Sequence, residues 1–130
     1  MSYAPPAPSP GLRLFGVGVN IDSTWLIFAL FIGWQLLDEF KGLPSTTALT
    51  ATALIVLGLS VSIFLHEMAH TLTGRALGMR IDRITLYMFG GVAELHEEPR
   101  TGGSEFLMAI AGPLLSVALW LALSAVVPLI

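Results

Sequence analysis

Charged residues are scarce in this 130-residue sequence. Only 12% of the residues are Asp, Glu, Lys or Arg, whereas 55% are hydrophobic and the mean hydropathy is +0.80. A soluble domain carries about 25% charged residues, so this composition indicates a protein of the lipid bilayer. The six Lys and Arg are dispersed and the formal net charge is −3. This charge distribution excludes nucleic acid as the expected partner.

Cysteine is absent, which excludes a disulfide framework, a Cys-type zinc site and a thiol nucleophile. Any metal must therefore be bound by His, Asp or Glu. A secretory signal is also lacking, because residues 1–10 are rich in Pro, Ala and Ser and have neither a basic start nor an apolar core. We expect residues 1–11 to be a flexible tail and residues 12–130 to be the membrane-embedded core.

Three apolar stretches predict about three transmembrane helices. The first, residues 23–37, is short at about 1.5 Å per residue against a hydrocarbon core of about 30 Å. We expect it to span only by recruiting preceding residues. The second extends from about residue 45 to about residue 77, and the third from Phe106 to Ile130. This pattern predicts a membrane α-helical fold.

The ends of the second helix carry recognisable signals. Ser45 or Thr46 follows a Gly-Leu-Pro turn and could cap the start of the helix. Gly78 follows the last apolar position and is suited to terminate the helix.

Short extended segments flank these helices. Residues 12–22 mix β-branched residues with two glycines, which predicts an extended or hairpin segment at the membrane surface. Residues 81–87 predict a strand, Phe89-Gly90-Gly91 breaks it, and residues 92–95 predict a second strand. Because unpaired backbone cannot face lipid, this β element between the second and third helices must line a protein cavity or lie at the interface.

The basic residues predict the orientation. Four arginines lie between the second and third helices, whereas a single lysine lies between the first and second. The positive-inside rule then places the N-terminus and the arginine-rich loop in the cytoplasm. We expect an integral membrane protein, of a bacterial-type plasma membrane, with its active site near the cytoplasmic side.

Two histidines lie four residues apart near the end of the second helix. This spacing puts His66 and His70 on one helix face, where both rings can reach one ion. Glu67 completes the His-Glu-x-x-His pattern of zinc hydrolases, in which the glutamate is the general base and not a ligand. The alternative is that these are ordinary polar residues at a frayed helix end. In a membrane helix they would cost on the order of several kcal/mol unless function or pairing offset that cost.

Other acidic residues and histidines are weaker candidates for a third metal ligand. A loop cluster could contribute one, although a solvated polar face explains it better; it consists of Glu94, His96, Glu97 and Glu98. Three aspartates fit no ligand spacing relative to His70, namely Asp22, Asp38 and Asp82. Since catalytic zinc normally has three protein ligands plus water, the sequence leaves the third ligand open.

Three segments together resemble the site-2 protease family of intramembrane zinc metalloproteases: His66 to His70, Ile84 to Ala93 with its Phe89-Gly90-Gly91 core, and Glu105 followed by Ala111-Gly112-Pro113. The resemblance extends from about residue 12 to the end. It implies cleavage of a peptide bond in or beside a substrate's transmembrane segment, with the Phe-Gly-Gly segment binding that substrate in extended form. The implied cofactor is Zn²⁺, and the implied partners are a transmembrane protein substrate and the bilayer.

Two departures from the family pattern bear on activity. The family commonly carries an asparagine three residues after the proline, where this chain has Ser116. It also takes its third zinc ligand from an aspartate in a later helix, and no such segment is present here. We therefore expect a core truncated at its C-terminus, which can be inactive alone. The alternative functions are a noncatalytic membrane protein that binds client helices and a protein that handles metal ions.

Overall fold

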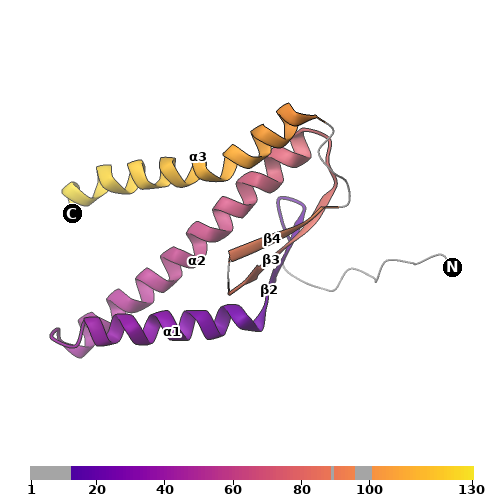
Figure 1. Ribbon diagram of the computed structural model, residues 1–130. Helices are drawn as coiled ribbons and strands as arrows, with labels where there is room; N and C mark the ends of the chain where they lie inside the picture. The colour runs from indigo at the N-terminus through magenta and orange to yellow at the C-terminus, as the bar shows by residue number, and fades with distance from the viewer. Residues whose placement is uncertain (1–12, 89, 96–100) are drawn as a thin grey trace.

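The computed structural model describes residues 13–88, 90–95 and 101–130, with backbone alone for residues 92–95 (Figure 1). The tail predicted at residues 1–11, Phe89 and the polar residues 96–100 lie outside the described residues. In chain order the elements are β1 (Arg13–Leu14), β2 (Val17–Ile21), α1 (Ser23–Glu39), α2 (Ser45–Ala76), β3 (Ile81–Tyr87), β4 (Gly90–Leu95), α3 (Gly102–Val126) and the 3₁₀ turn η1 (Val127–Leu129).

Helix α1 begins where a side chain satisfies its first free amides. Asp22 is the N-cap, and its carboxylate accepts the Thr24 backbone N–H at 3.1 Å. The helix continues through Glu39, two residues beyond the predicted end. It packs against the N-terminal half of α2, where Thr52 is buried.

Helix α2 has 32 residues and bears the histidine motif near its C-terminal end. The predicted caps at Ser45 and Thr46 were wrong, because Pro44 is the N-cap and no side chain caps the helix. A proline fits this place, since its fixed φ and missing N–H cost least at a helix start. The predicted stop is confirmed: Gly78 has φ +88°, the left-handed conformation that ends helices.

Helix α3 lies antiparallel to the C-terminal half of α2. It begins at Gly102, four residues before the predicted start, because the Thr101 hydroxyl accepts the Ser104 N–H at 3.0 Å and caps an additional turn. Pro113 lies inside the helix, where it removes one backbone hydrogen bond and favours a kink. The helix axis changes direction part-way along its length (Figure 1).

The predicted extended segments form one four-stranded sheet, in the order β1-β2-β3-β4. Strands β1 and β2 are an antiparallel hairpin, β2 pairs with β3 in parallel, and β3 pairs with β4 antiparallel. The extended or hairpin segment predicted at residues 12–22 is confirmed as β1 and β2, and the structure joins it to the β element predicted between the second and third helices. A parallel pair needs a long crossover, and here α1 and α2 supply it.

The sheet lies against the C-terminal half of α2. The core between them contains Val17, Met68, Ile84 and Leu86, with Ile63 and Phe64 packed against it. Burial of Ile84 and Leu86 on alternate positions of β3 shows that one sheet face is turned to the helix. This packing places the histidine motif between the sheet and α3.

Among the residues that the structure describes, two helices are long and apolar enough to cross a membrane: α2, and α3 with its 3₁₀ turn, Gly102–Leu129. In α1, 17 residues at about 1.5 Å each reach about 26 Å, short of a hydrocarbon core of about 30 Å.

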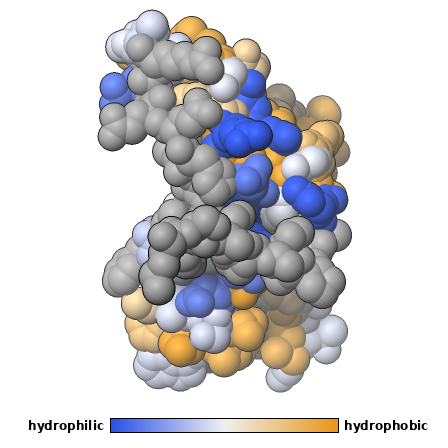
Figure 2. All heavy atoms as spheres, turned by 90° about the vertical axis from the view of Figure 1, so that its right-hand side faces the viewer, coloured by the Kyte–Doolittle hydropathy of each residue, from blue (hydrophilic) through white to orange (hydrophobic). Residues whose placement is uncertain are grey.

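Hydrophilic side chains gather at the end of the molecule that carries the sheet and the C-terminus of α2 (Figure 2). Exposed charged residues in this region include Arg13, Arg75, Arg80 and Asp82. Large apolar side chains are exposed along all three helices, as expected of a membrane protein.

Candidate metal centre

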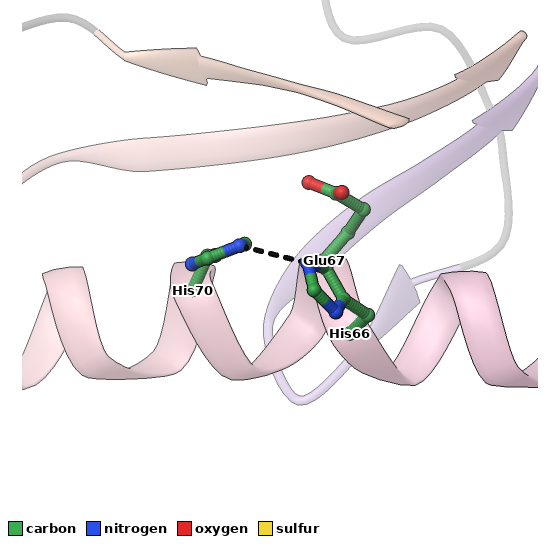
Figure 3. A group of neighbouring side chains, drawn as sticks. All are labelled: His66, Glu67 and His70. Carbon is green, nitrogen blue, oxygen red and sulfur yellow. Dashed lines mark hydrogen bonds between the residues drawn. The ribbon is translucent and has the colours of Figure 1, made fainter. Parts of the chain in front are cut away.

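The imidazoles of His66 and His70 converge on one point beside α2. Their Nε2 atoms are 3.1 Å apart, and the ring planes are nearly perpendicular at 80° (Figure 3). The helical spacing of four residues puts both side chains on one face, as the sequence predicted.

The outer nitrogen of each ring has a partner on α3. His70 Nδ1 lies 2.6 Å from the Met108 backbone carbonyl, and His66 Nδ1 lies 2.8 Å from the Ser116 hydroxyl. A carbonyl only accepts, so a neutral His70 ring carries its proton on Nδ1 and presents the Nε2 lone pair to His66. Such partners fix the orientation and tautomer of metal-binding histidines.

Gly112 is a residue of α3 that faces both imidazole rings. A Cβ at this position would lie 2.7 Å from His66 Nε2 and 2.6 Å from His70 Cε1, and would overlap His70 Nε2. Real Cβ atoms essentially never approach other atoms so closely. Only glycine therefore lets the helix backbone approach this near to the imidazoles.

Glu67 points towards the strands (Figure 3). A Cβ on Gly91 would overlap the Glu67 Cγ and lie 2.9 Å from its carboxyl carbon, so the backbone of β4 passes directly over this side chain. The carboxylate is thus held between α2 and the edge strand of the sheet.

The donor set fits a zinc ion. Ligand atoms of His66, Glu67 and His70 lie within 4.8 Å of one another. The usual Zn–N distance is about 2.1 Å, which in an ideal tetrahedron separates two nitrogens by about 3.4 Å, close to the observed 3.1 Å. Within the described residues this is the one such group, and Asp22, Asp38 and Asp82 are not part of it.

The remaining predicted site residues fall into two groups. The structure places Gly91 against Glu67, and gives Gly90 a φ of +127°, a conformation that other residues rarely adopt. Phe89 lies outside the described residues, as do His96, Glu97, Glu98 and the side chain of Glu94. The described residues therefore bring two histidines and one glutamate to the site.

Sequence reasoning missed three partners of the motif. No sequence pattern predicted that the Met108 carbonyl and Gly112 would contact the histidines, although Ala111-Gly112-Pro113 was part of the family resemblance. Ser116 was noted only as a departure, and the structure shows that its hydroxyl contacts His66. Its position four residues after Gly112 places both on one face of α3, which was the available signal.

Comparison with known proteins agrees with this geometry. The family model described as Peptidase family M50 matches residues 54–130, more than half of the chain. The chain belongs to peptidase family M50. This is the site-2 protease family, so the predicted resemblance is confirmed.

Relatives in peptidase family M50 carry names that refer to zinc metalloproteases. The chain is 35% identical over 117 residues to sll0528 of Synechocystis sp., covering 87% of this chain and 31% of that protein. It is 32% identical over 111 residues to Rip3 of Mycobacterium tuberculosis, covering 82% and 28%. It is 30% identical over 104 residues to MJ0392 of Methanocaldococcus jannaschii, covering 80% and 28%.

The chain thus spans less than a third of the length of these curated relatives. No solved structure gives a significant match.

Proposed function

We propose that this chain contributes the zinc-binding core of an intramembrane metalloendopeptidase, which cleaves peptide bonds in or near the transmembrane segments of membrane-held substrates. The observation that carries the proposal is the convergence of two histidine Nε2 atoms at 3.1 Å beside a glutamate, at the end of a helix long enough to span a bilayer. Membership of peptidase family M50 and the names of its relatives support it.

Each residue of the motif has a separate role in this proposal. His66 and His70 hold the ion through Nε2, and α3 orients both rings. Zinc, when bound there, supplies a Lewis acid that polarises the scissile carbonyl. Glu67 takes a proton from the attacking water and returns it to the leaving amine, the usual double task of a general base. A third ligand completes the set of three protein ligands typical of catalytic zinc.

The substrate is an extended peptide segment that lies along β4. This strand is an edge of the sheet, and an edge strand offers backbone donors and acceptors to an added strand. Gly91 permits close approach beside Glu67. A transmembrane substrate must unwind locally to bind in this way, which brings its peptide bonds within reach of the base.

Three membrane helices and a cytoplasmic active site complete the proposal. We infer that α1 spans a bacterial-type plasma membrane together with α2 and α3, with the arginine-rich end in the cytoplasm. The gathering of exposed arginines at the end of the molecule that carries the C-terminus of α2 supports this orientation.

The decisive experiment distinguishes loss of the general base from loss of a metal ligand. Zinc content and cleavage rate are measured for variants of the full-length protein, reconstituted with a transmembrane substrate. Glu67→Gln should retain zinc and lose about 10²- to 10⁴-fold in cleavage rate, the usual contribution of general acid–base catalysis. His70→Ala should lose both zinc and cleavage. Gly91→Ala should bind zinc normally and cleave slowly, because its Cβ displaces the Glu67 side chain.

The matched control is Glu39→Gln, an exposed carboxylate at the end of α1 that should leave both properties unchanged. Full cleavage by Glu67→Gln would reject Glu67 as the base. Zinc-dependent metal flux without any cleavage would instead favour a metal-handling protein.

A further inference from the structure

The N-terminus of α1 is hydrogen-bonded to the end of β3. The Asp22 backbone N–H donates to the Leu86 carbonyl at 2.8 Å. The Met88 backbone N–H donates to the Thr24 hydroxyl oxygen at 3.1 Å. Thr24 in turn donates its hydroxyl proton to the Asp22 carboxylate at 2.5 Å. These residues are far apart in sequence, and the hydrogen bonds join the start of α1 to the strand that pairs with β4.

The connection acts on the turn that leads into β4. Strand β3 ends at Tyr87, so the Met88 amide is beyond its last residue, and Thr24 supplies the partner for that amide. Gly90 opens β4 two residues later, and Gly91 contacts Glu67. The Met88 amide is thereby bonded to α1, and Gly91, three residues further on, lies over Glu67.

Helix capping alone does not account for the two hydrogen bonds that the Thr24 hydroxyl makes. Asp22 already caps α1 by accepting the Thr24 backbone N–H at 3.1 Å, which any residue at position 24 except proline could donate. The hydroxyl donates to this carboxylate, which orients its lone pairs towards Met88. A side chain that bridges the cap and the strand in this way links the position of α1 to that of the turn.

We propose that Thr24, oriented by Asp22, is a positioning residue that holds the β3–β4 turn so that β4 presents an extended peptide to Glu67. The proposal rests on the proposed function, since it assigns a task in substrate binding. It differs from a catalytic role because Thr24 acts through the Met88 backbone. Loss of the hydroxyl should loosen the turn and weaken substrate binding, while the metal centre on α2 and α3 stays intact.

The test compares two variants of the full-length protein. Thr24→Val removes the hydroxyl at nearly constant volume, and Thr24→Ser keeps it. Both are made in the Glu67→Gln background, where a fluorescent synthetic transmembrane peptide can bind without being cleaved. Three quantities are measured: hydrogen exchange of the Met88 amide, the Kd of the peptide and the affinity for zinc.

We expect Thr24→Val to raise the exchange rate of the Met88 amide by about tenfold, the factor that a hydrogen bond of about 1.4 kcal/mol provides. Its peptide Kd should rise by a factor of up to about ten for the same reason. Thr24→Ser should match the parent in both measurements, and zinc affinity should be unchanged in both variants.

Unchanged Met88 exchange in Thr24→Val would overturn the proposed connection. Faster exchange with an unchanged peptide Kd would overturn its role in substrate binding. Equal losses in both variants, together with weaker zinc binding, would indicate a general packing role and also overturn the proposal. Absence of cleavage by the unmutated protein would reject the proposed function separately, because none of these three measurements requires cleavage.

Discussion

Gly112→Ala should disrupt the metal centre without changing any residue that binds metal. The added Cβ would lie 2.7 Å from His66 Nε2, which is 0.7 Å below the 3.4 Å at which ordinary van der Waals contact begins. It would also overlap His70 Nε2. Ligand atoms of a zinc site tolerate displacements of only about 0.2 Å. Either the imidazoles or α3 must therefore move further than the site allows.

The loss of zinc affinity expected in Gly112→Ala can be bounded from the contacts that α3 makes with the histidines. If α3 moves away, the Nδ1 partners on Met108 and Ser116 move with it. Loss of such partners costs about 10- to 100-fold in metal affinity, or about 1.4 to 2.7 kcal/mol. Direct displacement of both Nε2 atoms should raise this cost, so we expect at least a 100-fold loss.

The assay is competition for zinc with a chromophoric chelator in detergent micelles, with far-UV circular dichroism as a check on helix content. Gly103→Ala is the matched control in the same helix, because among the described residues its Cβ would have no neighbour within 4 Å other than Thr101 Oγ1 at 3.9 Å. If Gly112→Ala bound zinc as tightly as the control, with equal helix content, the inferred contact between α3 and the histidines would be wrong.

Three further predictions address single contacts. Ser116→Ala should weaken zinc binding by about 10- to 100-fold, because His66 loses its outer partner; equal affinity in a chelator competition would contradict this. The hydroxyl of Thr24 lowers the pKa of the Asp22 carboxyl below its ordinary 3.8. The resulting stabilisation is present above pH 3.8 and is lost as pH falls through the lowered pKa. An NMR titration should therefore give a midpoint below 3.8, and one at or above 3.8 would contradict it. Thr71 is fully buried, and its hydroxyl has no hydrogen-bond partner among the described residues. Thr71→Val should therefore raise the free energy of unfolding by about 1 kcal/mol, and a lower midpoint in denaturant titration would refute it.

Much of the fold followed from local sequence patterns. The long uncharged run and Gly78 gave the extent of α2 to within a residue, because apolar composition and a left-handed stop act locally. The caps were less predictable. Several Ser and Thr residues lie near the helix starts, and the structure has Pro44 as the N-cap of α2 and Thr101 as the N-cap of α3. The β segments were located correctly, but their pairing into one sheet was not predicted.

The amino-acid sequence by itself determined that the two histidines converge, because a spacing of four residues on a helix brings His66 and His70 together wherever the helix lies. Only the tertiary structure decided what surrounds them. The partners of His66 and His70 on α3 lie 50 and 38 residues further along the chain, and the parallel pairing of β2 with β3 depends on how α1 and α2 fold back. Contacts over such separations depend on the packing of helices and sheet, which no local pattern encodes.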